Sequence, residues 1–289
     1  MTIPTVPPYA GQLPDDSDPV TFSDRAEAVF DWLVTGAAPA ISSVASEMNA
    51  ALAGDPGSVV EAVGDIQDRL GPGYLPGAPV YLQSGSGNWA VPAGLKALEI
   101  RVFGAGGAAG GVDGSGGTDD ATSGGGGGGG YCRHFHQHVP GQSYSYQVGA
   151  GGVSAAGNAA GTDGGASSFA SSGSLALSAG GGRGGSGDAG KNTGQANGGA
   201  GGMASGGTLN LTGQAGGMGK VNAGNPVPTG HGGAPGAEFP GTEIRFMNQD
   251  GADATSPGAG GAGAIANSVS DDYRGGHGAP GLIIIQPYF

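Results

Sequence analysis

The sequence predicts a mainly β protein in which short N-terminal helices form a trimeric stem, followed by a small β-sandwich with glycine-rich, polyglycine-II-like insertions. Three observations support this fold class. Glycine makes up 68 of the 289 residues. Apolar residues recur at three- and four-residue steps within the first 72 residues, which is typical of helices, and short β-favouring runs bracket the glycine tracts. We therefore divide the chain into residues 1–36 (an extended segment and a first helix), 37–72 (a short helical or coiled-coil stem), 73–88 (a linker) and 89–289 (the glycine-rich β-sandwich domain).

The N-terminal part carries three helix patterns. The first helix begins near Thr21 and ends at Gly36, the second starts around Pro39 and stops at Gly54, and the third begins with a capping box at Ser58. Each helix has one apolar stripe and is short enough to be marginal alone. The stripes could pack against copies of the chain in a parallel trimer or dimer, or the helices could form an ordinary hairpin against the rest of the chain.

The C-terminal part alternates short strands with glycine. A Pro140–Gly141 turn predicts a β-hairpin between two of the strands. The strands are expected at Trp89–Gly94, Leu95–Val102, Tyr131–Val139, Ser143–Gly149, Ser167–Ala170, Ser174–Leu177, Thr242–Phe246 and Gly281–Tyr288.

The glycine tracts between these strands are either disordered or ordered through their backbone. Glycine loses the most conformational freedom on folding, so an ordered tract needs its amide and carbonyl groups paired by close neighbours. Only 11% of the residues are charged, which argues against charge-driven disorder. The run Gly124–Gly130 and its surroundings are therefore predicted to adopt the extended threefold conformation and to pack side by side.

Composition excludes several classes of protein. The net charge of −13 disfavours nucleic-acid binding, and the glycine lacks the strict period of collagen. The N-terminus does not resemble a signal peptide, and no apolar stretch is long enough for membrane insertion. The single cysteine, Cys132, cannot form an intrachain disulfide.

Few residues suggest catalysis or metal binding. His134, His136 and His138 alternate along one strand, so they share a face with Cys132. Repeated around a threefold axis they could bind a transition metal, although an exposed polar face of an edge strand is the simpler interpretation. No catalytic triad or pair of carboxylates lies on elements that would position it. We therefore expect no enzymatic activity, no metal and no cofactor.

The C-terminal part contains several spaced motifs in one order, at Trp89 with 91–94, then 100–107, 130–131, 140–144, 148–152 and 278–285. Together they resemble the glycine-rich C-terminal domain of bacteriophage tail fibres. Residues 13–26, with a Ser-Asp-Pro-x-x-Phe segment leading into a helix, also resemble the start of many short phage tail proteins.

The resemblance implies a homotrimeric protein of the virion tail, made in the host cytoplasm without a signal peptide. Its N-terminus would dock on phage tail or baseplate/hub proteins, with Asp18, Pro19 and Phe22 as the tail-attachment residues. Its C-terminal domain would bind a host cell-surface glycan or outer-membrane protein. The short helical region favours a short fibre or a tip over a long fibre.

Large side chains that interrupt the small-residue scaffold are the candidates for receptor binding, because aromatic residues and arginine carry most interface energy. Phe239 and Phe246 could instead fill the small core. The candidates are Arg183, His231, Phe239, Phe246, Tyr273, Arg274 and His277.

Two other functions also fit the sequence. A glycine-rich structural matrix or cell-wall protein would share the composition. A fibre with cryptic glycan-cleaving activity would share the motifs.

Overall fold

The computed structural model describes residues 75–114, 120–188, 194–222, 225–227, 230–244 and 247–289. The chain divides into two units, Met1–Gly73 and Tyr74–Phe289, and the described residues all belong to the second. The predicted stem helices and the predicted attachment residues Asp18, Pro19 and Phe22 lie outside the described residues. Within the described ranges the chain is mainly β and forms no helix, and so none that could cross a membrane.

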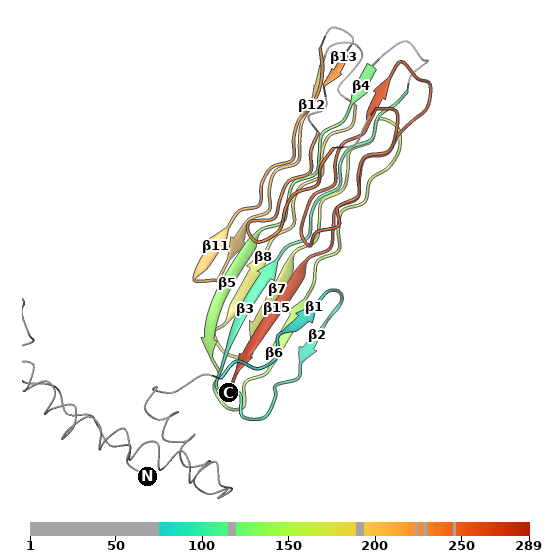
Figure 1. The fold of residues 1–289 in the computed structure, drawn as a ribbon. Coiled ribbons are helices and arrows are strands. Elements are labelled where there is room, and N and C mark those ends of the chain that lie inside the picture. The colour runs from blue at the N-terminus through green and yellow to red at the C-terminus, as the bar shows by residue number, and fades with distance from the viewer. Residues whose placement is uncertain (1–74, 115–119, 189–193, 223–224, 228–229, 245–246) are drawn as a thin grey trace, which may run out of the picture. The chain divides into compact units, whose positions relative to one another are not determined.

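The strands are short and all of their pairings are antiparallel (Figure 1). They are β1 (Val80–Leu82), β2 (Ser86–Trp89), β3 (Ala97–Phe103), β4 (Asp120–Thr122), β5 (Tyr131–Gln137), β6 (Tyr144–Gln147), β7 (Ser167–Ser171), β8 (Ala176–Ala179), β9 (Gly194–Ala196), β10 (Ala204–Ser205), β11 (Leu209–Leu211), β12 (Gly219–Asn222), β13 (Asn225–Val227), β14 (Ile265–Asn267) and β15 (Leu282–Tyr288).

Two five-stranded sheets, β1-β15-β3-β5-β11 and β10-β8-β7-β6-β2, pack against each other. Alternate residues of β3 and β15 point at the second sheet, where Tyr144 and Phe169 stack with ring centroids 5.5 Å apart. Burying each large apolar side chain contributes about 1.5–3 kcal/mol. The fully buried members of this core are Leu98, Ile100, Val102, Cys132, Tyr144, Phe169, Ala179, Ile283 and Ile285.

Most predicted strands are present near their expected positions. The β-favouring runs that begin at Leu95, Tyr131, Ser143, Ser167 and Gly281 correspond to β3, β5, β6, β7 and β15. The prediction of a strand at Thr242–Phe246 is wrong: Thr242–Ile244, the part of it that the structure describes, is not in a strand. There the chain runs beside a glycine segment instead, and Gly232 N donates to Thr242 O at 2.9 Å.

The predicted hairpin at Pro140–Gly141 is also wrong. A turn is present, but β5 pairs with β3 in one sheet while β6 pairs with β2 and β7 in the other. The chain therefore crosses from sheet to sheet at this turn. The physical reason is that the two strands bury facing sides, with Cys132 and Tyr144 in one shared core.

Residues 75–88, interpreted from composition as part of a linker, contribute β1 and most of β2. Val80 to Leu82 pair with β15, and Ser86 to Trp89 pair with β6. Each segment thus becomes the edge of one sheet. The first strand predicted on sequence, Trp89–Gly94, is displaced: β2 ends at Trp89, and a turn follows with Gly94 at φ 78°.

Beyond the sheets, the glycine-rich segments run side by side in an extended form (Figure 1). The run 124–130 shows how they are held. Its amide N–H groups donate in turn to three different segments, so that residues three apart donate to the same neighbour. The acceptor carbonyls lie in segments 180–186, 214–217 and 258–261. The carbonyls of the run in turn accept from amides in segments 104–110, 199–202 and 233–236. All of these N···O distances are 2.8 to 3.1 Å.

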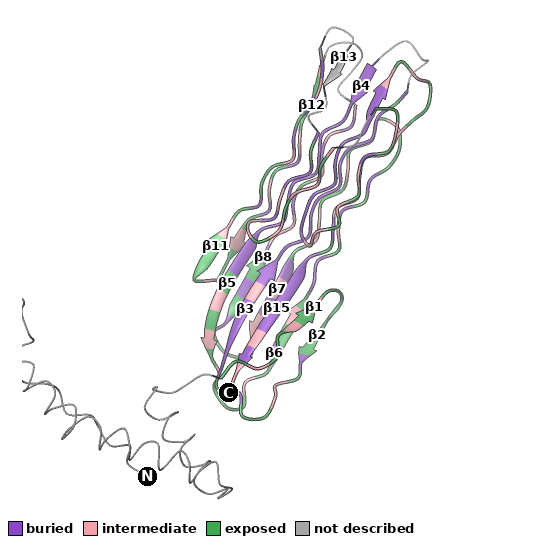
Figure 2. Cartoon of the chain, viewed as in Figure 1, coloured by how far each residue is buried: buried purple, intermediate pink, exposed green. Residues whose placement is uncertain are grey.

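The stretch 104–112 has the same arrangement. Its amides donate in a period of three to segments 124–130, 159–165 and 273–279. A period of three is the one that an extended threefold chain requires. Both stretches are buried throughout, as Figure 2 shows for the centre of the bundle. We call this arrangement of hydrogen-bonded glycine segments the glycine lattice.

The spacing of the glycine lattice leaves no room for side chains at its centre. A Cβ atom added at Gly126 would overlap the carbonyl oxygen of Gly107, and one added at Gly128 would overlap that of Ala234. Backbone cannot yield as the end of a flexible side chain can. The side-by-side packing predicted for the run 124–130 is therefore a direct contact between backbones.

The two ends of the unit differ in construction. At the sandwich end, which we call the base, Leu75 and Phe289 exchange backbone hydrogen bonds of 2.9 Å. The first and last described residues of the unit therefore lie side by side. At the other end, which we call the far end, β4 pairs with β14, and β12 lies between β9 and β13. The glycine lattice joins these two ends.

Replacing Gly126 and Gly128 with alanine is expected to destabilise the fold strongly, because each methyl group would force backbone segments apart. Overpacking a tight interior costs about 1–3 kcal/mol per site or more. Thermal unfolding monitored by circular dichroism measures the effect. The control is Gly87→Ala on the edge strand β2, where the new Cβ would make only ordinary contact with Tyr146, at 3.6 Å. Equal unfolding temperatures for the two proteins would contradict a close-packed lattice.

Candidate functional site

The predicted receptor-binding residues do not form one site. Tyr273, Arg274 and His277 lie together on the last glycine segment, beside residues 250–254. Arg183 lies on a different segment, between residues 161–165 and 197–203. His231 is exposed on a third segment, and Phe246 lies outside the described residues.

Arg274 is held by two carboxylates. Its guanidinium contacts Asp253 in a bidentate manner, with Nη1 to Oδ1 at 2.7 Å and Nη2 to Oδ2 at 3.1 Å. Nε lies 3.4 Å from Asp250 Oδ2, and the backbone N–H donates to Asp250 Oδ1 at 3.0 Å. The hydrogen bond from Arg274 is the main reason that the pKa of Asp253 lies below its ordinary value. Arg274 therefore ties two neighbouring segments together, with its side chain 30% exposed.

The neighbours of Arg274 are fixed in the same way. The backbone N–H of His277 donates to Asp253 Oδ1 at 2.8 Å, and its Nδ1 accepts from Ser154 N at 3.0 Å. The proton of neutral His277 is therefore on Nε2. Tyr273 forms a bridge with Val112 and packs on a small apolar cluster. The three candidates thus present a rigid polar surface.

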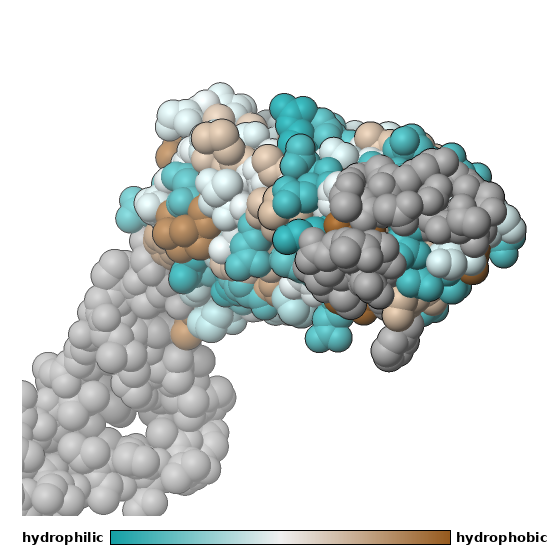
Figure 3. Space-filling view, turned by 90° about the horizontal axis from the view of Figure 1, so that it is seen from above, coloured by the Kyte–Doolittle hydropathy of each residue, from teal (hydrophilic) through white to brown (hydrophobic). Residues whose placement is uncertain are grey.

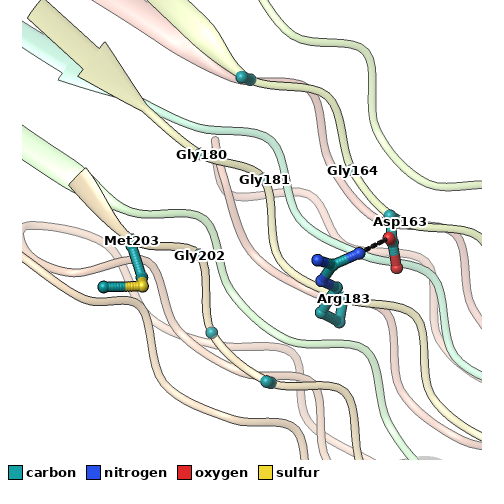
Figure 4. Close-up of a pocket in the computed structure, with 10 residues that line it drawn as sticks. Asp163, Gly164, Gly180, Gly181, Arg183, Gly202 and Met203 are labelled. Carbon is teal, nitrogen blue, oxygen red and sulfur yellow. Dashed lines mark hydrogen bonds and ion pairs between the residues drawn. The ribbon is translucent and has the colours of Figure 1, made fainter. Parts of the chain in front are cut away.

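A second polar feature surrounds Arg183. Its Nη1 lies 2.5 Å from Asp163 Oδ2, and both residues line an open groove of about 520 Å³ whose other walls are mainly glycine and alanine (Figure 4). Asp163 also accepts from Gly184 N, and this bond is the largest cause of its lowered pKa. Met203 lines the groove with 76% of its surface exposed. The Arg183 side chain is 71% exposed, so the ion pair contributes at most about 1 kcal/mol and can open to a ligand.

Phe239 is partly buried on the outer face of the sheet that contains β3 and β15, next to the glycine lattice. It packs on Phe103 with ring centroids 5.1 Å apart, beside the buried residues Tyr131, Leu282 and Ile284. This is the core role that the sequence left as an alternative. On the same outer sheet face, Glu99 is buried between Arg133 (2.6 Å) and Arg101 (2.8 Å). Burial opposes ionisation of Glu99, but the hydrogen bonds from the two arginines lower its pKa overall.

His134, His136 and His138 face the second sheet and are half-buried, which differs from the exposed polar face considered on sequence grounds. His138 Nδ1 lies 2.9 Å from Tyr144 Oη, and His136 Nε2 lies 3.1 Å from Gln142 Oε1. His134 Nδ1 is buried and has no hydrogen-bond partner among the described residues. Among these residues no group of three or more potential ligand side chains is placed to hold a metal ion.

One hollow on the surface was not predicted from the sequence. Tyr81 of β1, Gln83 just after β1, Thr255 and Pro257 at a turn, and Pro280 before β15 surround a hollow of about 260 Å³. Tyr81 lies in the segment that is predicted to be a linker, so nothing in the sequence predicts that its side chain is exposed at a sheet edge. An aromatic residue within a Pro- and Gly-rich stretch is the one signal that could have drawn attention to it.

Seen from above the view of Figure 1, hydrophilic residues cover much of the visible surface, with hydrophobic residues in small separate patches (Figure 3). At the far end a hollow of about 660 Å³ is lined by Asn248, Gln249, Asp250, Asp271, Asp272 and Tyr273. This hollow is therefore polar and acidic.

The half-buried histidines make stability depend on pH. Burial, and then the charge of His136, lower the pKa of His134 and His138. The unfolded chain, with histidine at about 6.5, binds protons before the folded chain does. The free energy of unfolding should therefore decrease as pH falls below about 6.5 towards the lowered pKa values of the folded state.

Denaturant unfolding between pH 7 and pH 5 measures this slope, and His134→Leu should reduce it. Val139→Ala, at an exposed position just after β5 that carries no titratable group, is the control and should leave the slope unchanged. Identical slopes for the wild type and His134→Leu would show that His134 does not titrate differently in the folded state.

Comparison with known proteins connects this construction to a family. A search of curated protein sequences gave no significant match. A family model described as a glycine-rich domain matches residues 82–288, which include nearly all of both sheets, the glycine lattice and the far end. The chain belongs to this glycine-rich domain family.

Proposed function

We propose that this protein is a structural component of a phage tail, a short fibre or tip, that attaches the virion to a receptor on the host cell without catalysis. The observation that carries the proposal is the glycine lattice, which separates the base from the polar far end through paired backbone segments. The resemblance of the sequence motifs to glycine-rich tail-fibre domains supports the same conclusion.

The lattice suits a rigid spacer. The central segments 104–112 and 124–130 are hydrogen-bonded on all sides, so that bending them would break bonds to several neighbours together. We infer that the segments are of the polyglycine-II type. A rigid spacer is useful where a recognition surface must be held away from its point of attachment.

The two ends suit different partners. The chain enters the unit at the base, where Leu75 pairs with Phe289. Residues 1–73 precede this point, and we propose that they form the homotrimeric stem and contact the tail or baseplate/hub proteins. We assign the contact with a cell-surface glycan or outer-membrane protein to the polar hollow at the far end, which Tyr273 lines, and to the nearby Arg274 and His277.

Pre-organisation supports a recognition role for Tyr273, Arg274 and His277. Arg274 is fixed by Asp250 and Asp253, and His277 by Asp253 and Ser154. Side chains that are already ordered lose less entropy when a ligand binds. The surface can therefore bind without rearranging.

Competition for adsorption tests the proposal. Cells incubated with the purified full chain should adsorb virions that carry this protein more slowly, because the receptors are occupied. The double variant Tyr273→Ala/Arg274→Ala should lose at least about tenfold of this competing activity if these residues carry the interface energy. Phe135→Ala, at an exposed aromatic residue on the sandwich, is the matched control and should compete normally.

If neither the wild type nor Phe135→Ala slows adsorption, the proposed attachment to the host is contradicted. Two further measurements separate the alternatives. Sedimentation as an expanded monomer would favour a matrix protein, and release of reducing sugars from host polysaccharide would indicate glycan cleavage.

A further inference from the structure

We propose that the hollow beside Tyr81 is a binding site for a single neutral sugar ring. This inference deepens the proposed function, on which it rests, by naming the class of ligand and a second place on the unit where it binds. The site lies where β1 and β15 meet the glycine lattice, and its lining residue Ala254 donates its backbone N–H to His277 O at 2.9 Å.

The walls of the hollow are fixed by the backbone. Tyr81 is opposite Ile284 in the pairing of β1 with β15. Gly258 N donates to Pro280 O at 2.8 Å, and Ala259 N donates to Ser256 O at 3.0 Å, which closes the turn that carries Thr255 and Pro257. Gly258, at φ 75°, has the backbone conformation that this turn requires and that glycine adopts without strain. The site is therefore formed before any ligand arrives.

The lining has the two kinds of group that a sugar ring needs. A pyranose has a face of C–H groups and a rim of hydroxyls. The ring of Tyr81, 56% exposed, offers an electron-rich face for the C–H groups. Gln83 and Thr255 offer an amide and a hydroxyl, which can donate to and accept from the sugar hydroxyls.

These groups are available to a ligand. Within the described ranges, no hydrogen bond or ion pair engages the side chains of Tyr81, Gln83 or Thr255. The other lining residues are apolar or glycine, including Pro257, Pro280 and Leu282. The hollow thus has unused polar groups on one side and apolar surface on the other.

Charge and size decide which ligand fits. No charged residue lines the hollow, although the chain carries a net charge of −13, so an ionic ligand would find no partner there. Its volume of about 260 Å³ lies below the roughly 300–1,000 Å³ of sites for drug-sized ligands. A single ring fits these limits. A proline-rich peptide would require a row of aromatic residues, and Tyr81 is the one aromatic residue in this lining.

Binding of simple glycosides to the purified full chain tests the site. Methyl glycosides of glucose, galactose, mannose, rhamnose and N-acetylglucosamine are titrated and followed by saturation-transfer NMR. At least one should bind. Tyr81→Ala should weaken its binding by about tenfold or more, since a central aromatic contact is lost. Tyr81→Phe keeps the ring and should bind within about threefold of the wild type, as should the control Phe135→Ala.

Three results would overturn the proposal: no glycoside binds, Tyr81→Ala binds as well as the wild type, or a proline-rich peptide binds at Tyr81 in place of the glycosides. Adsorption assays separate this inference from the proposed function. If the chain blocks adsorption but binds no glycoside, the site is rejected and host attachment stands. If glycosides bind at Tyr81 but the chain never blocks adsorption, the site stands and host attachment is rejected.

Discussion

Backbone hydrogen bonding between glycine segments is the interaction on which the rest of the structure depends. A net contribution of about 0.5–1.5 kcal/mol per hydrogen bond is comparable with the roughly 1–2 kcal/mol that ordering one residue costs. The segments would therefore gain little from pairing alone. They continue directly from β3, β8 and β11 and lead into β5, β7 and β15, so the apolar core of the two sheets fixes their starting positions. The core supplies the free energy, and the lattice extends its order.

The same constraint explains where chemistry can occur. At every position of the run 124–130 an added Cβ atom would overlap another backbone, and the side chains buried in the stretch 104–112 are those of alanines and Val112. Functional groups are confined to the surface of the lattice, its far end and the sandwich. The Arg274 cluster, the Arg183 groove and the hollow beside Tyr81 all lie on such outer positions. Because their backbones are held by the lattice, these few side chains are presented in fixed geometry.

The histidines show how tertiary packing changes the meaning of a pattern. Alternation along β5 correctly indicates that His134, His136 and His138 share a face with Cys132. Whether this face looks outward or into the sandwich depends on the partner sheet, which the pattern does not contain. Because β6 lies in that partner sheet, Tyr144 and Gln142 lie beside the histidines. The same crossing of the chain makes the predicted hairpin wrong.

The sequence by itself determined the β character, the positions of β3, β5, β7 and β15, and the ordering of the glycine tracts in a period of three, because these follow from local propensity and from the absence of Cβ atoms. It also placed Phe239 among the residues that could fill a core. Only the tertiary structure decided which segments pair, that residues 80–88 form sheet edges, and that Tyr81 lines the same hollow as Thr255, more than half of the chain away in sequence. Such contacts join residues remote in sequence, and glycine backbones carry no side-chain pattern that would specify their neighbours.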